Sequence, residues 1–144
     1  MRASGRSTVR PKGLIDANAI VAIVDAGDVW HRRCREALNA TPIPLATSAA
    51  ALAEVFHLLA AHEVESAWKF LASGIVTLLP IGDTDAPDLR RLMLKYADRP
   101  MDFADATLVR LAEREGFTTI LTVDEDFEIY RIGGRKAFRV LPRR

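Results

Sequence analysis

Five short apolar segments separated by helical segments constrain the fold more than any other feature of the sequence. These segments are residues 14–15, 45–47, 75–79, 118–122 and 138–141. Strands of a parallel sheet are buried on both faces, so they read as short continuous apolar runs rather than as an alternating pattern. Strands that alternate with helices predict an α/β fold with a parallel sheet covered on both faces. A chain of 144 residues has room for one such domain.

Apolar spacing and end signals predict six helices between these strands. We expect them over residues 19–24, 28–39 with Asp28 as N-cap, 48–62 with Ser48 as N-cap, 64–73 before Gly74, 84–96 with Thr84 as N-cap, and 103–115 before Gly116.

Charge is unevenly distributed along the chain. Residues 1–15 and 130–144 hold ten of the twenty Lys and Arg and no acid, whereas residues 16–129 carry ten bases and all nineteen acids, a net charge of −9. An acidic body with basic ends suggests a metal site in the body and contact with an anionic polymer at the ends. We expect residues 1–12 to be a disordered basic extension and residues 13–144 to be a single domain.

Hydropathy and cysteine usage indicate a cytoplasmic protein. The longest uncharged stretch, residues 37–53, contains two prolines and several polar residues, so we expect no membrane span. No apolar segment typical of a signal peptide follows the basic N-terminus. Cys34 is the only cysteine, which suits a reducing compartment, and we interpret it as a small buried hydrophobe.

Carboxylates occur where ligands bind in such sheets, at strand ends and helix starts. Asp16 ends the first strand, Asp124 follows the fourth, and Asp102 and Asp105 lie in a helix first turn. Each has a purely structural explanation: Asp16 can hold a turn with Asn18, the helix-start acids interact with the helix dipole, and Asp124 can form a turn.

Glu54 is the hardest acid to explain structurally. Residues 47–61 contain no other ionisable group except His57, and the helical neighbours Ala50, Ala51 and Leu58 of Glu54 are apolar. A lone carboxylate on an apolar helix face costs several kcal/mol, on the order of 3–5, unless a cation or hydrogen bonds compensate.

Taken together, these acids predict a site for a hard cation. The sequence has four or five candidate carboxylates, few histidines and no glycine-rich phosphate loop. Oxygen ligands of this kind select Mg²⁺ or Mn²⁺, which can activate water beside a phosphodiester.

Four segments resemble the motifs of PIN domains, and in particular the VapC-type toxins of bacterial toxin–antitoxin pairs. They are Leu14-Ile15-Asp16-Ala17-Asn18, Ala53-Glu54-Val55, Pro100-Met101-Asp102-Phe103-Ala104-Asp105-Ala106 and Thr122-Val123-Asp124-Glu125-Asp126-Phe127. The resemblance covers residues 13–142. An extension of twelve residues before the first strand departs from the pattern, since these toxins begin almost at that strand.

The resemblance implies a three-layer α/β/α sandwich and a Mg²⁺- or Mn²⁺-dependent endoribonuclease. It also implies an RNA substrate, a homodimer and a cognate antitoxin whose C-terminal segment wraps the cleft. Carried over by position, the acids of the metal pocket are Asp16, Glu54, Asp105 and Asp124. Additional pocket candidates are Asp102, Asn18, Thr122 and Asp126.

We expect Asp16, Asp105 and Asp124 to hold the cation, with Glu54 completing the shell or deprotonating the attacking water. Basic residues near the C-terminus are candidates for binding the RNA backbone: Arg131, Arg135, Lys136 and Arg139. Trp30 and His31 can stack on a base, but a Trp that anchors its helix beside an exposed His is the interpretation we favour.

Two functions of other classes are alternatives. In a phosphatase-like fold Asp16 would be a covalent nucleophile, but that chemistry needs a second acid two residues on, where this chain has Asn18. In a non-catalytic PIN-like module that only binds protein or RNA, Glu54 would have no need to lie in an apolar helix.

Overall fold

Five three-residue strands form one parallel sheet in the computed structural model, which describes residues 9–143. The sheet order is β3-β2-β1-β4-β7, and all four pairings are parallel. The strands are β1 (Gly13–Ile15), β2 (Leu45–Thr47), β3 (Val76–Leu78), β4 (Thr119–Leu121) and β7 (Arg139–Leu141). The predicted α/β class is confirmed.

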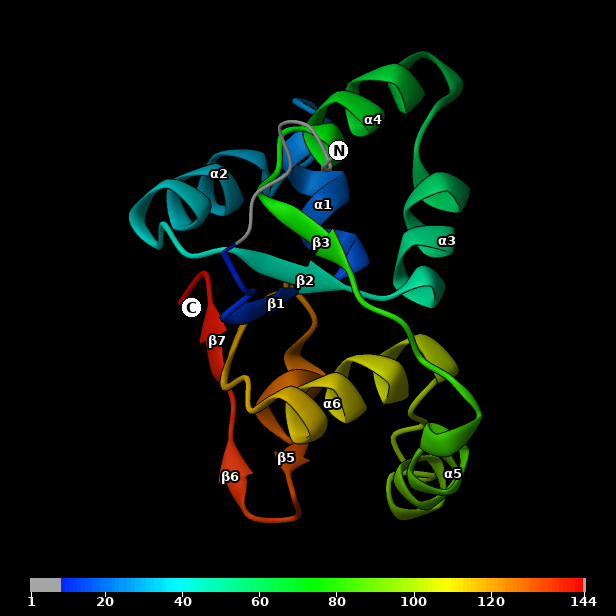
Figure 1. The fold of residues 1–144 in the computed structure, drawn as a ribbon. Coiled ribbons are helices and arrows are strands. Elements are labelled where there is room, and N and C mark those ends of the chain that lie inside the picture. The colour runs from blue at the N-terminus through cyan, green and yellow to red at the C-terminus, as the bar shows by residue number, and fades with distance from the viewer. Residues whose placement is uncertain (1–8, 144) are drawn as a thin grey trace, which may run out of the picture.

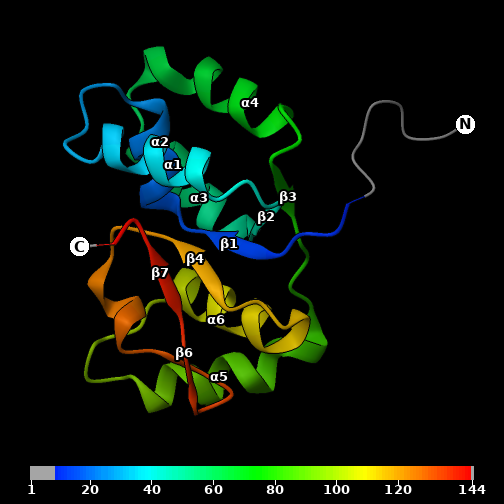
Figure 2. The ribbon, with the colours of Figure 1, turned by 90° about the vertical axis from the view of Figure 1, so that its left-hand side faces the viewer.

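Helices cover both faces of this sheet, so the molecule has the predicted three layers. The helices are α1 (Ala17–Val24), α2 (His31–Ala40), α3 (Ala49–Leu58), α4 (Val64–Ala72), α5 (Ala86–Lys95) and α6 (Phe103–Glu115). Figure 1 shows α1, α2 and α4 above the sheet and α5 and α6 below it. The same separation is seen in the view turned by 90° (Figure 2).

The strand order reverses between β1 and β4. From β1 the chain adds β2 and then β3 on one side, and after α5 and α6 it returns to place β4 and then β7 on the other. Loops on the two sides of such a reversal leave in opposite directions, which opens a crevice at the carboxyl ends of the strands. The crevice therefore lies between the residues that follow β1 and those that follow β4.

The two central strands are buried because both faces of the sheet are covered. Leu14, Ile15, Ile120 and Leu121 have no exposed surface, and Cys34 is also fully buried, as predicted. Burying each such Leu or Ile contributes about 1.5–3 kcal/mol. These strands hold the polar residues beyond their ends in fixed positions.

Several helix boundaries differ from prediction. The first helix begins at Ala17 rather than at residue 19, with Asp16 as its N-cap. The helix expected to reach residue 62 ends at Leu58, because buried Leu59 takes an extended backbone (ψ 144°) and turns into the core. Asp28 accepts a hydrogen bond from the Trp30 backbone N–H (2.8 Å), but α2 starts only at His31. Thr84 caps no helix, since it lies inside the 3-10 helix η2 (Asp83–Asp85).

A short antiparallel hairpin, β5 (Arg131–Ile132) and β6 (Lys136–Ala137), was not predicted. Its turn contains Gly133 and Gly134, whose φ values of 61° and 78° lie in the left-handed region that favours glycine.

Most of the expected basic extension, residues 1–8, lies outside the described residues. Of the remainder, Lys12 donates its backbone N–H to the Pro44 carbonyl (2.8 Å), and Arg10 lies 3.7 Å from a carboxylate oxygen of Glu115. Within residues 9–143, no helix is both long and apolar enough to cross a membrane.

Candidate metal centre

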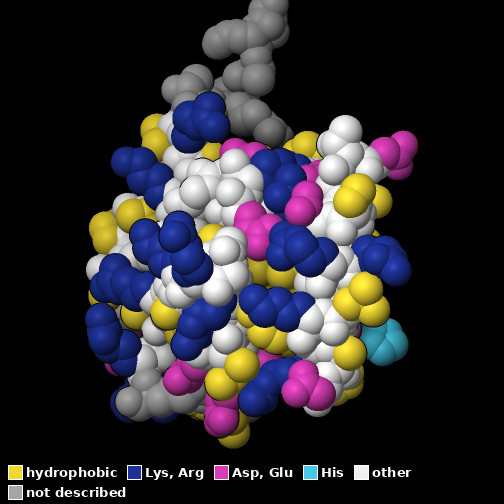
Figure 3. Space-filling view, turned by 90° about the horizontal axis from the view of Figure 1, so that it is seen from below, with side chains coloured by type: hydrophobic (Ala, Val, Ile, Leu, Met, Phe, Trp, Pro, Cys, Tyr) yellow, Lys and Arg dark blue, Asp and Glu magenta, His cyan; other side chains and the backbone are white. Residues whose placement is uncertain are grey.

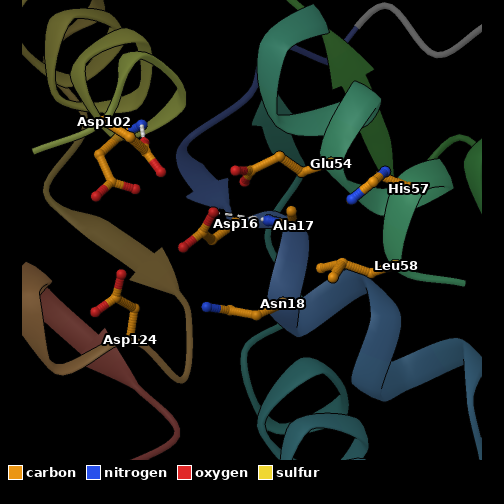
Figure 4. Close-up of a pocket in the computed structure, with 9 residues that line it drawn as sticks. Asp16, Ala17, Asn18, Glu54, His57, Leu58, Asp102 and Asp124 are labelled. Carbon is orange, nitrogen blue, oxygen red and sulfur yellow. Dashed lines mark hydrogen bonds between the residues drawn. The ribbon is translucent and has the colours of Figure 1, made fainter.

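A pocket opens at the carboxyl ends of β1 and β4, at the point where the strand order reverses. The described residues that line it are Asp16, Ala17, Asn18, Glu54, His57, Leu58, Asp102, Asp105 and Asp124. Five of these nine residues are acids, and none is Lys or Arg. Figure 4 shows the carboxylates of Asp16, Glu54, Asp102 and Asp124 around a common space.

Asp16 joins β1 to α1 and is almost fully buried. Its Oδ1 accepts the Ala17 backbone N–H (2.7 Å), which makes it the N-cap of α1. Its Oδ2 accepts the hydroxyl of Thr122 (2.9 Å) from the end of β4. Hydrogen bonds to both oxygens therefore fix the orientation of this carboxylate.

The loop after β4 is held to the same point by polar side chains. Thr122 Oγ1 accepts the backbone N–H of Asp124 (3.0 Å), and Asn18 Oδ1 accepts the backbone N–H of Val123 (3.1 Å). Asp124 Oδ1 in turn accepts the backbone N–H of Asp126 (2.9 Å). This network sets the Asp124 carboxylate opposite Asp16.

Asp105 enters the pocket from the first turn of α6, where the N-cap Asp102 accepts its backbone N–H (2.8 Å). The hydroxyl of Tyr130 donates to its Oδ2 (2.9 Å). The helix start and a buried tyrosine thus position the third acid.

Three of the acids converge closely. Asp16, Asp105 and Asp124 each offer a carboxylate oxygen that lies within 4.8 Å of those of the other two. Two oxygens bound to one Mg²⁺ at 2.0–2.1 Å are about 3–4 Å apart, so small side-chain adjustments would let the three share an ion. The donor set and its spacing fit a hard divalent cation.

The pKa values of the pocket acids also indicate a site for a cation. Burial raises the pKa of Asp16 from 3.8 to about 7, and the nearby carboxylates of Asp124 and Glu54 add to this effect. Burial also raises the pKa of Asp105 to about 8, with added repulsion from Asp102 and Asp16. A bound cation would favour the ionised carboxylates and reverse these shifts.

Glu54 and Asp102 line the pocket but do not belong to the close cluster of three. Glu54 is half-buried on α3, and burial together with Asp102 and Asp124 raises its pKa. Asp102 uses its Oδ1 to accept the backbone N–H of Asp105 as the N-cap of α6. The carboxylate of Asp126 lies 3.5 Å from Arg99, and Asp126 is not among the lining residues.

The basic residues predicted to bind RNA are not among the described residues that line this pocket. Arg135 and Lys136 belong to the β5–β6 hairpin, and Arg131 donates to backbone carbonyls of residues 128–130. Arg139 is opposite Thr119 at the amino end of the sheet. Figure 3 shows Lys and Arg side chains spread over the face seen from below, with Asp and Glu among them.

Trp30 and His31 are also outside the pocket lining. His31 Nδ1 is 2.7 Å from the Ala22 carbonyl, and partly buried Trp30 packs against the core with the Arg33 guanidinium 4.6 Å from its ring centre. These contacts favour the helix-anchoring interpretation for Trp30, but His31 is half-buried rather than exposed as expected.

Sequence reasoning missed two residues of the site, Tyr130 and His57. His57 follows Glu54 by one helical turn, so the spacing alone is enough to place it on the same face. Tyr130 carries no such signal, because its contact with Asp105 spans 25 residues.

Comparisons with known proteins match this architecture. The sequence profile of the PIN domain family matches residues 13–133. Ribonuclease VapC26 of Mycobacterium tuberculosis (strain ATCC 25618 / H37Rv) is 32% identical over 134 residues, which cover 90% of this chain and 99% of that protein.

Two solved structures share the fold. The first is Mycobacterium tuberculosis VapC20, a toxin that cleaves the sarcin–ricin loop, with a TM-score of 0.73 and 20% identity over 81% of this chain and 92% of that one. The second is a chain of a toxin–antitoxin complex from Klebsiella pneumoniae, with a TM-score of 0.59 and 21% identity over 78% of this chain and 87% of that one. At these identities the likeness supports the three-layer fold.

Proposed function

Because the chain belongs to the PIN domain family, we propose that it is a metal-dependent endoribonuclease, the toxin component of a type II toxin–antitoxin pair. The observation that carries this proposal is the convergence of Asp16, Asp105 and Asp124 in a pocket whose described lining holds no Lys or Arg. The 32% identity of this chain to Ribonuclease VapC26, over nearly the whole chain, supports the same activity.

Mg²⁺ or Mn²⁺ is the cofactor that the donor set supports, since carboxylate oxygens without thiolate or imidazole ligands suit hard cations. Asp16, Asp105 and Asp124 would hold it. When bound, such an ion supplies positive charge to the phosphodiester and makes water a better nucleophile.

The protein residues orient the reaction. Thr122 and Ala17 keep the carboxylate of Asp16 from rotating away. Glu54, half-buried at the side of the cluster, would complete the oxygen ligands of the cation or accept the proton of the attacking water. Attack on phosphorus breaks the bond to the 3′ oxygen, which takes up a proton, so the products are a 5′-phosphate and a 3′-hydroxyl.

We propose that the protein acts on RNA and binds a cognate antitoxin. We also propose that it works in the cytoplasm as a homodimer. The bases Arg131, Arg135, Lys136 and Arg139 would contact RNA outside the pocket, because none of them is among its described lining residues. Such contacts weaken as salt concentration rises.

The alternatives have less support. A non-catalytic binding module has no need to keep two buried carboxylates and a half-buried one together against their mutual repulsion. A phosphatase-like mechanism lacks its second acid, and Asn18 instead accepts a backbone hydrogen bond from Val123.

The direct test is cleavage of total bacterial RNA by the purified chain, followed by sequencing of the RNA ends. We expect new 5′-phosphate ends with Mn²⁺ and none with a chelator. Asp16→Asn and Glu54→Gln should abolish cleavage, whereas Asp98→Asn, which changes an exposed acid outside the pocket, should not. Normal cleavage by the first two variants would contradict the proposal.

A further inference from the structure

Tyr130 links the hydrophobic core to the acidic pocket. It lies just before the β5–β6 hairpin, is fully buried, and donates its hydroxyl to Oδ2 of Asp105 at 2.9 Å. A buried tyrosine hydroxyl needs a hydrogen-bond partner, and here the partner is one of the three clustered carboxylates. Burial and the Asp105 carboxylate raise the pKa of Tyr130, so the hydroxyl remains a donor.

The ring that carries this hydroxyl is held on several sides. Tyr96 and Phe127 pack edge-on against it, with ring centres 5.0 and 5.1 Å away, and Phe138 packs edge-on against Phe127 at 5.6 Å. The backbone N–H of Tyr130 also donates to the Asp126 carbonyl (3.0 Å). The hydroxyl is therefore a fixed donor rather than one that follows its acceptor.

Asp105 depends on this donor more than Asp16 depends on either of its own hydrogen bonds. Asp16 accepts hydrogen bonds on both oxygens. Within residues 9–143, the Asp105 carboxylate accepts a single hydrogen bond, and Tyr130 donates it. Repulsion from Asp102 and Asp16 acts on the same carboxylate. Without the tyrosine hydroxyl, this carboxylate would be free to rotate away from the other acids.

We propose that Tyr130 is a positioning residue: its hydroxyl holds one oxygen of Asp105 so that the carboxylate presents its remaining lone pairs to the divalent cation. This inference rests on the proposed metal site. Groups that hydrogen-bond to metal ligands commonly change metal affinity or activity by 10–100-fold when removed.

The chain contains a matched control in Tyr96. It is also buried and belongs to the same aromatic cluster, but its hydroxyl accepts the backbone N–H of Arg131 (3.0 Å) and bonds no carboxylate of residues 9–143. Tyr96→Phe and Tyr130→Phe each remove one buried hydroxyl. Only the second removes a hydrogen bond to a pocket acid.

The experiment measures Mn²⁺ binding by calorimetry, below the melting temperature of each variant. We expect Tyr130→Phe to bind Mn²⁺ about tenfold more weakly than the natural chain, and Tyr96→Phe to bind it equally well. RNA cleavage by Tyr130→Phe should fall at low Mn²⁺ and recover at saturating Mn²⁺. In an Asp105→Asn background, the Tyr130→Phe change should have no further effect on Mn²⁺ affinity.

Unchanged Mn²⁺ affinity in Tyr130→Phe would overturn this inference and leave the metal site intact. If that variant does not melt cooperatively, Phe127→Leu replaces it, because it keeps the hydroxyl but loosens the ring; Mn²⁺ affinity should again fall, and an unchanged value would equally overturn the inference. Absence of Mn²⁺ binding by the natural chain would instead refute the proposed function.

Discussion

Asp85 and the pocket acids Asp16 and Asp105 are all buried, but the protein surrounds them differently. Arg110 and Arg114 each lie 2.9 Å from an oxygen of Asp85. Around Asp16 and Asp105, the described pocket lining supplies further carboxylates and no Lys or Arg.

The two environments shift the pKa of their acids in opposite directions. Hydrogen bonds from the Gly82 backbone and from Arg110 lower the pKa of Asp85, and the charge of Arg114 adds to this. Burial raises the pKa of Asp16 to about 7 and that of Asp105 to about 8. An acid whose counter-charge is built into the chain joins structural elements, whereas acids without one are available to an external cation.

The largest effect is expected when a pocket acid is replaced, and it is on catalysis. Asp105→Asn removes one charge from the close cluster and should lower the RNA cleavage rate by about 1000-fold, since several kcal/mol of transition-state stabilisation is lost. Single-turnover cleavage at fixed Mn²⁺ measures this loss. Above about pH 8, where Asp105 is ionised in the metal-free protein, the variant should melt at the same or a higher temperature, because repulsion is relieved. A clearly lower melting temperature there would contradict the electrostatic explanation.

Asp85→Asn should have the opposite outcome, with cleavage retained and stability lost. Removing one partner of a buried ion pair costs 3–5 kcal/mol, and because both arginines retain some solvent contact we expect about 2–3 kcal/mol. Urea denaturation measures the free energy of unfolding. Loss of cleavage in a fully folded Asp85→Asn chain would show that this cluster also serves the reaction.

The pH dependence of the metal-free protein sharpens the comparison. The folded pKa values of Asp16 and Asp105 lie above the unfolded value near 4, so the folded state binds more protons between about pH 4 and 8. Their contribution to the free energy of unfolding is therefore fully present below about pH 4 and is lost as pH rises to 8, by at most about 1.4 kcal/mol per pH unit for each group.

Urea denaturation across this range, with the natural chain compared with Asp16→Asn, isolates the contribution of Asp16. The variant should lose less stability as pH rises. Parallel curves for the two proteins would show that Asp16 titrates in the folded state as it does in the unfolded chain. For Asp85 the sign is reversed, because its contribution is present above pH 4 and is lost as pH falls through its lowered pKa.

The smallest effect is expected at an exposed ion pair. Arg99 lies 3.5 Å from the Asp126 carboxylate, and both side chains are substantially exposed to solvent. Arg99→Ala should change the free energy of unfolding by no more than about 0.5 kcal/mol, as is usual for exposed pairs. A loss as large as that of Asp85→Asn would mean that burial is not what distinguishes the two pairs.

Much of the fold could be predicted because short apolar strands and helix end signals are local features. Gly116 closes α6 with φ 82°, and Ser48 caps α3, both as the sequence indicates. The break after Leu58 could not be predicted, because neither Gly nor Pro marks it. Leu59 leaves the helix to reach the core, which is a tertiary effect.

The candidate site was predictable only where it depends on local features such as strand ends. Asp16 and Asp124 follow strands, and parallel strands bring their carboxyl ends together, so the sequence alone predicts that these acids lie close. The hydrogen bond from Tyr130 and the arginines around Asp85 depend on packing between distant segments. No local pattern encodes them.

The strand order has a consequence for the protein while it is being made. β1 and β4 are neighbours in the sheet but are separated by more than 100 residues of chain, and the cluster takes one acid from beside each. A growing polypeptide on the ribosome cannot assemble the site until β4 has emerged and paired with β1. The cluster of Asp16, Asp105 and Asp124 is therefore incomplete until the ribosome has made the chain through β4 and the loop that follows it.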